Sequence, residues 1–140
     1  IQFEITETVA TEYSASLGMV VDELTAAGIR LCLDDFGSGY ANLNTVMRLP
    51  FSTIKIDRSL LFDICNDEKR AQFYQSVVET FRKMNYHIVS EGVETREEME
   101  LISRWGVDMI QGYYFSRPLP EEALISLMQT ETMSASVNDK

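Results

Sequence analysis

Short apolar runs recur along the chain and alternate with segments in which apolar residues follow a helical spacing. The runs predict strands over residues 1–5, 29–33, 53–56, 86–89 and 107–110. The segments between them predict helices over residues 13–27, 40–48, 68–84, 94–105 and 120–128. This alternation is typical of α/β proteins with a mainly parallel sheet that is buried on both faces. Residues 130–140 are polar, and we predict a frayed, disordered tail there.

Polar side chains interrupt the apolar pattern at or just after the end of every predicted strand. These residues are Glu4, Asp34, Lys55, Glu91 and Gln111. The C-terminal ends of parallel strands share one rim, and α/β proteins build their ligand sites on that rim whether the sheet is closed or open. We therefore expect the five side chains to contribute to one site.

The acidic pair Asp34 and Asp35 has two interpretations. Asp is a favoured N-cap residue, so the pair could cap the helix that follows. On a rim shared with Glu4 and Glu91, however, adjacent carboxylates repel each other unless a cation offsets their charge. Carboxylate oxygens suit Mg²⁺, Mn²⁺ or Ca²⁺, and a carboxylate that bridges two ions would form a two-metal site for attack on phosphorus.

Lys55 lies within an apolar strand and also has two interpretations. It could be structural, with its stem buried and its ammonium paired with Asp57 or another acid. Beside metal-binding carboxylates it could instead orient an attacking water or stabilise charge on a phosphate. A Rossmann cofactor site is not indicated, because Asn42 stands where the glycine-rich fingerprint needs Gly or Ala. His87 opens a strand and is expected to be structural.

The charge balance limits the partners of the chain. Its 22 acidic and 12 basic residues give a net charge of −10, which argues against binding to a DNA or RNA polymer. Cys32 and Cys65 form no CxxC pair and are too few for a disulfide framework, which suits a reducing cytosol. No apolar run is long enough to cross a membrane. We therefore predict a cytoplasmic domain, whose parent protein could still be membrane-anchored.

Five motifs stand in order along the chain: FEITE at 3–7, DDFGSGY at 34–40, IKIDR at 54–58, SEGVET at 90–95 and QGYYFSRP at 111–118. Together they resemble the EAL family of cyclic-di-GMP phosphodiesterases. The resemblance implies a modified TIM barrel that hydrolyses cyclic-di-GMP to linear pGpG with two Mg²⁺ or Mn²⁺ ions, and that Ca²⁺ inhibits. It also implies a homodimer and, in the parent protein, a possible sensory or GGDEF domain.

The resemblance further implies a role for each matching residue. Glu4 matches a ligand of the first metal, Asp34 a ligand of both metals, and Asp35 and Glu91 ligands of the second. Lys55 and Glu91 match catalytic residues, Lys55 as the lysine that contacts the catalytic water. Gln111 and Pro118 match substrate-binding residues. Thr6, Glu7 and Glu94 match residues that anchor the loop from Phe36 to about Asn44, which in the family couples substrate and metal binding to dimerisation.

The family's EAL segment, with a metal-binding Glu, a substrate-binding Arg and an Asn ligand, precedes the first matching motif and is absent from this chain. A (β/α)₈ barrel takes roughly 250 residues, so 140 residues hold four to five of its eight units. We therefore predict that residues 1–129 form the fourth to eighth units of an incomplete barrel. Such a fragment is expected to self-associate and to be inactive, since its first metal keeps only Glu4 and Asp34.

Two other functions share features with this sequence. A non-catalytic receptor for cyclic-di-GMP, or a protein-interaction domain, is possible if the absent segment is degenerate, although the intact acids and Lys55 argue for an enzyme. A receiver domain also combines about five βα units with an acidic pair and a lysine. That class requires the pair on the first strand and the lysine on the fifth, and the order here differs.

Overall fold

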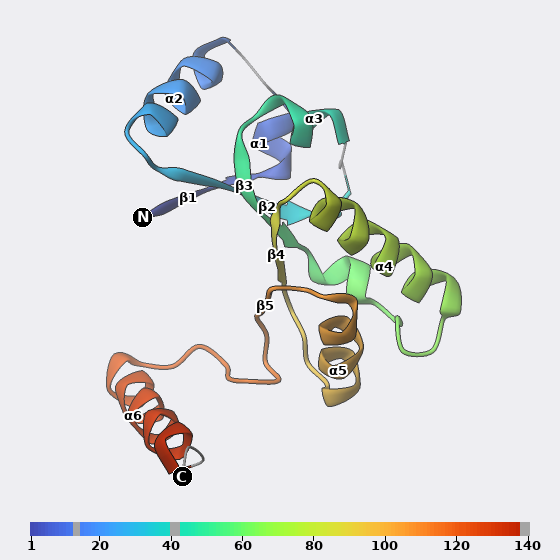
Figure 1. The fold of residues 1–140 in the computed structure, drawn as a ribbon, viewed down its shortest axis with the longest axis vertical. Helices are drawn as coiled ribbons and strands as arrows, with labels where there is room; N and C mark the ends of the chain where they lie inside the picture. Colours follow the sequence, from blue (N-terminus) through green and yellow to red (C-terminus); the bar gives the residue numbers. More distant parts are fainter. Residues whose placement is uncertain (13–14, 40–42, 138–140) are drawn as a thin grey trace.

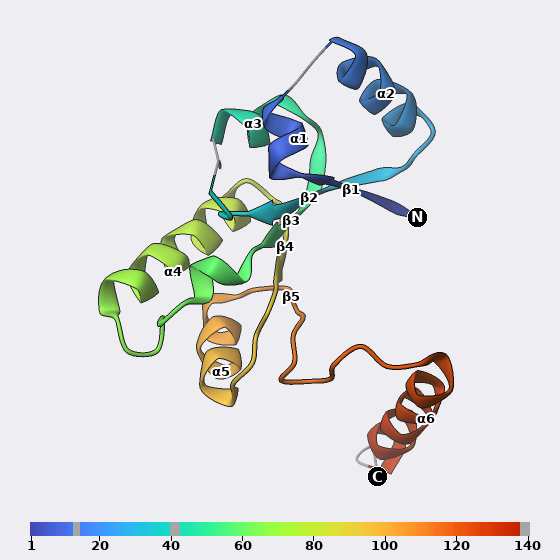
Figure 2. The same ribbon diagram turned by 180° about the vertical axis from the view of Figure 1, so that it is seen from behind.

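The computed structural model describes residues 1–12, 15–39 and 43–137 and contains a five-stranded parallel sheet (Figures 1 and 2). The strands lie in chain order, each paired with the next. Their bounds are β1 Gln2–Thr6, β2 Arg30–Phe36, β3 Phe51–Ile56, β4 His87–Ser90 and β5 Met109–Ile110. This order and direction are those of consecutive βα units of a barrel wall, and the sheet is an incomplete α/β barrel as the sequence predicted.

Helices follow every strand. Their bounds are α1 Glu7–Thr11, α2 Ala15–Ala26, α3 Leu43–Arg48, the 3₁₀ helix η1 Arg58–Leu61, α4 Glu68–Lys83, α5 Arg96–Trp105 and α6 Glu121–Val137. The short helices α1 and η1 were not predicted, because a single turn carries no periodic apolar pattern. The helices predicted over 13–27 and 40–48 correspond to α2 and α3, and their predicted starts at residues 13 and 40 lie outside the described residues.

Local sequence signals define the longer helices. Asp67 caps α4 by accepting hydrogen bonds from the Lys69 and Arg70 amides. Thr95 and Glu98 form a capping box at the start of α5. Gly106 ends α5 in the left-handed conformation, which a residue without a Cβ adopts at little cost. These caps satisfy amides and carbonyls that a helix end otherwise leaves without partners.

One face of the sheet forms the core. Leu33, Ile54 and Ile88 share a row across β2, β3 and β4, and each is at most 1% exposed. They pack with apolar side chains of the helices, among them Val78 and Phe81 of α4. Figure 1 shows α4 and α5 on this side of the strands. The tyrosine hydroxyl of the buried Tyr74 donates a hydrogen bond to Ser90 Oγ at 2.8 Å, which ties α4 to the end of β4.

The opposite face of the sheet is polar and open. Its side chains line a hollow of about 550 Å³, with Glu4, Cys32, Thr53, Lys55 and His87 among them. The strand registers pair Glu4 with Cys32, Cys32 with Thr53, and Thr53 with His87, so these four side chains share one row. In a closed barrel this face points to the interior.

Helix α6 runs to Val137, beyond the predicted end near Met128. Residues 130–137 are therefore helical where a frayed tail was predicted, and residues 138–140 lie outside the description. Figures 1 and 2 show α6 apart from the other elements, at the end of a long connection after β5. Within the described part of the chain, no helix has the length and apolarity to cross a membrane.

Candidate active site

A β-bulge places Asp34 and Asp35 at the rim of the sheet. Leu33 pairs with Ile54 and Phe36 pairs with Ile56, so two residues of β2 stand opposite the single residue Lys55 of β3. In a regular strand, successive side chains point to opposite faces. The bulge interrupts that alternation. Asp35 is the extra residue, and its backbone is left-handed with a φ of 58°. The sequence predicted that the strand ends at Leu33, whereas β2 continues through both acids to Phe36.

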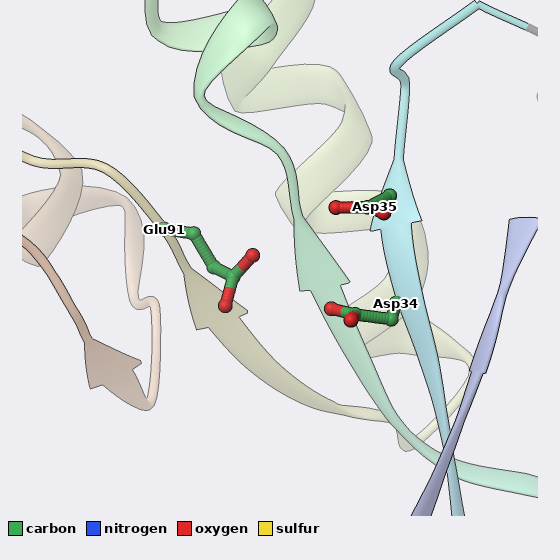
Figure 3. Close-up of side chains that lie close together, drawn as sticks. All are labelled: Asp34, Asp35 and Glu91. Carbon is green, nitrogen blue, oxygen red and sulfur yellow. The ribbon is translucent and has the colours of Figure 1, made fainter.

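Three carboxylates converge over the end of β3. Asp34 and Asp35 belong to β2, and Glu91 is the residue directly after β4. Each contributes an oxygen atom such that the three oxygens lie within 4.8 Å of one another. Figure 3 shows Asp34 and Glu91 facing each other across β3, with Asp35 one residue further along β2. This donor set suits a hard divalent cation, as predicted for these residues.

Lys55 connects the carboxylates. Its ammonium lies 2.8 Å from Asp34 Oδ1, 2.8 Å from Glu91 Oε1 and 3.3 Å from Glu4 Oε1. Glu4 is thus joined to the site through Lys55, while the cluster of three oxygens does not include it. The structural alternative, an ion pair of Lys55 with Asp57 or another acid, is thus met by these rim acids, and no pair with Asp57 is found among the described residues. Lys55, Asp34 and Glu91 are shielded from solvent, with side-chain exposures of 12, 19 and 17%, whereas Glu4 is 51% exposed.

The titration of these groups follows from burial and mutual repulsion. Burial opposes the charge on Lys55, but its hydrogen bonds to Asp34 and Glu91 outweigh that effect and raise its pKa above 10.5. Burial raises the pKa of Glu91, and Lys55 opposes the rise. Burial also raises the pKa of Asp35, and repulsion from Asp34 and Asp57 adds to it. The ammonium is therefore protonated at neutral pH and serves as a hydrogen-bond donor and counter-charge.

Replacing Lys55 with methionine is expected to lower the melting temperature in a pH-dependent way, measured in EDTA by circular dichroism. Glu91 and Asp35 have pKa values above their unfolded values, so their ionisation in the folded chain costs stability as the pH rises. Without the ammonium both pKa values rise further. The melting temperature of Lys55→Met should lie furthest below that of the wild type near pH 7, and the difference should shrink as the pH falls toward about 4.5.

Lys83→Met is the matched control, because it removes one exposed lysine from α4 and leaves the rim intact. It should change the melting temperature little at either pH. A deficit for Lys55→Met that stays constant or grows on acidification would show that Lys55 does not compensate these carboxylates.

The two predicted substrate residues lie beside the cluster. Gln111 directly follows β5 and, with Glu91 and Tyr113, lines a pocket of about 260 Å³. Pro118 is exposed and lines a second pocket of about 350 Å³, which Gln111 and Tyr113 also border. The structure therefore places Gln111 next to the carboxylates and places Pro118 one pocket further along the rim.

The three predicted loop-anchoring residues differ in their contacts. Glu7 is 2% exposed, and its Oε2 accepts a hydrogen bond from the Gly37 amide at 2.9 Å, directly beyond the bulge. Thr6 ends β1 beside Asp34, and its side chain makes no capping hydrogen bond to α1. Glu94 does not reach this loop within the described residues, and it pairs with Arg58 at 3.0 Å. Residues 40–42 of the loop lie outside the description.

Sequence reasoning missed the segment that directly follows Lys55. Asp57 caps η1 by accepting a hydrogen bond from the Ser59 amide, and Ser59 Oγ donates to the Gly37 carbonyl at 3.1 Å. A carboxylate two residues before a serine is a capping signal that could have indicated the turn. The contact with Gly37 could not be read, because the two residues are 22 positions apart.

A comparison with protein-family models matches residues 1–118 to the EAL domain. The chain belongs to the EAL domain family. The curated relative MucR of Pseudomonas aeruginosa, a bifunctional diguanylate cyclase and cyclic di-GMP phosphodiesterase, is 36% identical over 123 residues, which are 88% of this chain and 18% of MucR. This EAL chain thus spans less than a fifth of that protein.

Solved structures that contain cyclic di-GMP share the fold. The PaMucR phosphodiesterase in complex with c-di-GMP has a TM-score of 0.78 and 36% identity, covering 88% of this chain and half of that one. Klebsiella pneumoniae BlrP1, in a complex with manganese and cyclic di-GMP, has a TM-score of 0.77 and 35% identity, covering 84% of this chain and 30% of that one. BlrP1 has also been solved with calcium and the dinucleotide, so divalent cations accompany the ligand in this family.

Proposed function

We propose that this chain is the catalytic rim of a metal-dependent phosphodiesterase domain that hydrolyses cyclic-di-GMP to linear pGpG. The observation that carries the proposal is the convergence of Asp34, Asp35 and Glu91, with the Lys55 ammonium paired to Asp34 and to Glu91. Membership of the EAL family, with relatives solved in complex with this dinucleotide, supports the choice of substrate. The net charge of −10 makes a DNA or RNA polymer an unsuitable partner.

The donor set fits Mg²⁺ or Mn²⁺. We assign Asp35 and Glu91 to one ion, Glu4 to the other and Asp34 to both, and we expect Ca²⁺ to bind without supporting turnover. When bound, the cations would offset phosphate charge and lower the pKa of the attacking water. With all four acids ionised, Lys55 compensates only one of four negative charges, so the rim favours further cations.

The chain's own residues have distinct roles in this proposal. Lys55 keeps its proton, and Nζ orients the attacking water and stabilises the negative charge that develops on the phosphate. Glu91 holds Lys55 Nζ in place from the opposite side of β3 to Asp34. Gln111 and Pro118 bind the dinucleotide along the neighbouring pockets. Glu7 restrains the loop after the bulge through the hydrogen bond that it accepts from the Gly37 amide, which supports the orientation of Asp35.

We further propose that turnover requires more of the barrel than this chain supplies. The polar inner face of the sheet borders an open hollow, and among the described residues our assignment gives the first metal only Glu4 and Asp34. The chain alone should bind one cation and hydrolyse no substrate. In the native protein we expect a homodimer in the cytoplasm, where both cysteines stay free, with a sensory or GGDEF domain alongside, as the bifunctional name of MucR suggests.

The test is hydrolysis of cyclic-di-GMP by the native protein that carries residues 1–140, with Mg²⁺ or Mn²⁺, followed by chromatography of the product. We expect linear pGpG, no turnover in Ca²⁺, and no turnover by the 140-residue chain alone. Glu91→Gln in the native protein should abolish turnover. Binding of the dinucleotide without cleavage would refute the enzyme and favour a cyclic-di-GMP receptor.

A further inference from the structure

The 3₁₀ helix η1 lies between the two parts of the carboxylate cluster. It follows β3, whereas Asp35 comes from β2 on one side and Glu91 follows β4 on the other. A glycine with positive φ lies shortly after each acid. Gly37, two residues after Asp35, has a φ of 97°, and Gly92, directly after Glu91, has a φ of 71°. Both glycines are packed against side chains of η1.

The first contact joins η1 to the segment after Asp35. Ser59 Oγ donates a hydrogen bond to the Gly37 carbonyl at 3.1 Å. The side chain of Leu60 covers Gly37 so closely that a Cβ there would overlap it. On its amide side Gly37 is held by Glu7. The residue two positions beyond Asp35 is therefore fixed through both of its peptide groups.

The second contact joins η1 to the segment after Glu91. Arg58 Nη1 lies 3.0 Å from Glu94 Oε1, three residues beyond Glu91. A Cβ at Gly92 would overlap Arg58 Cβ, an atom that cannot move away from its own backbone. Arg58 thus holds the turn after Glu91 through its charged end and through its stem.

The base of η1 is itself well fixed. The Asp57 amide donates to the Phe36 carbonyl at 3.0 Å, and the Asp57 side chain accepts from the Ser59 amide at 2.9 Å. Leu61, at the end of η1, is 3% exposed and belongs to the core. A displacement of either flanking segment is therefore transmitted to a short, anchored element rather than to a free loop.

We propose that Ser59 and Arg58 are positioning residues that couple Asp35 to Glu91 through η1. The coupling counteracts the repulsion that would separate three carboxylates whose oxygens lie within 4.8 Å. Glu94 makes no direct contact with the loop after the bulge within the described residues. It is connected to that loop indirectly, through its ion pair with Arg58 and the hydrogen bond from Ser59 to Gly37. The inference rests on the proposed function only in that the coupled acids bind a metal.

The first experiment measures the coupling without metal. In Arg58→Gln the stem at Gly92 remains and the ion pair with Glu94 is lost. Hydrogen exchange of the Gly37 amide, on the far side of η1, should become roughly threefold to tenfold faster, measured by NMR in EDTA. Arg96→Gln removes a comparable exposed ion pair, with Glu100 at 2.7 Å on α5, and should leave the Gly37 amide unchanged.

The second experiment measures Mn²⁺ affinity of the 140-residue chain by electron paramagnetic resonance. Ser59→Ala should weaken binding about threefold to tenfold, the equivalent of one lost hydrogen bond. Ser59→Thr keeps the hydroxyl and should restore the affinity. Ser52→Ala removes a similar hydroxyl bond, to the Leu31 carbonyl at 3.1 Å at the other end of β3, and should have no effect.

The outcomes separate this inference from the proposed function. If Arg58→Gln leaves Gly37 exchange at the wild-type rate, or if Mn²⁺ binds tightly and Ser59→Ala binds it equally well, η1 does not couple the acids. If the chain binds no Mn²⁺ while Arg58→Gln still accelerates exchange at Gly37, the coupling stands and the metal site fails.

Discussion

Replacing Asp34 with asparagine is expected to weaken Mn²⁺ binding by at least about a hundredfold and to abolish hydrolysis in the native protein. Asp34, like Glu91, belongs both to the carboxylate cluster and to the ion pairs of Lys55, and in the proposed site it is the ligand assigned to both ions. Asparagine keeps the size and one oxygen but removes the charge. Calorimetry or electron paramagnetic resonance of the chain measures the affinity, and product chromatography measures turnover.

Asp22→Asn provides the control for this change, because it makes the same charge difference at an exposed position of α2. It should bind Mn²⁺ like the wild type. Circular dichroism shows whether Asp34→Asn remains folded, as expected when Lys55 still contacts Glu91 and Glu4. Undiminished Mn²⁺ affinity in a folded Asp34→Asn variant would place the metal elsewhere and overturn the proposed site.

Replacing Gly112 with alanine is expected to lower the free energy of unfolding by about 3 kcal/mol, measured by urea denaturation. A Cβ at Gly112 would overlap the backbone nitrogen, carbon and oxygen of Val93. Those atoms cannot yield easily, because the Val93 amide donates to the Gln111 carbonyl and the Val93 carbonyl accepts from Tyr114. The two segments that carry Glu91 and Gln111 would have to separate.

Gly28→Ala distinguishes steric overlap from backbone strain. Gly28 has a φ of 76°, and no atom lies within 4 Å of the position that a Cβ would take. Gly28→Ala should therefore lower the free energy of unfolding by only about 1 to 2 kcal/mol, the cost of a left-handed alanine. If the two substitutions cost the same, the close approach of Gly112 to Val93 does not contribute to stability.

Much of the fold could be predicted because apolar spacing reports which face of each element is buried. The five strands follow from it, and their common direction follows from their alternation with helices. Asp34, Lys55, Glu91 and Gln111 lie at or just after the ends of their strands, whereas Glu4 lies in the middle of β1, in the row of Cys32 and Thr53. The features that could not be predicted carry no periodic apolar signal in the sequence. Helix α1 and η1 are too short for a periodic signal, and the length of α6 depends on residues without an apolar stripe.

The residues of the site were predicted, but the backbone geometry that brings them together was not. The motifs indicated Asp34, Asp35, Lys55 and Glu91, and the structure brings these four together. That two consecutive acids reach one side of a sheet was not explained by strand alternation, since it requires the bulge opposite Lys55. Glu94 was predicted to anchor the loop, and the ion pair that it forms with Arg58 of η1 was not predicted.

The bulge leaves position 35 without a conservative replacement. Asn and Asp are the side chains that most readily accept the left-handed conformation seen there, apart from glycine. In the proposed site a carboxylate here would also offset part of the charge of the cation, whereas asparagine would supply a neutral oxygen and glycine no side-chain ligand. Glutamate has the charge but tolerates the backbone poorly. Aspartate combines the charge that the proposed cation favours with the left-handed backbone that the bulge imposes.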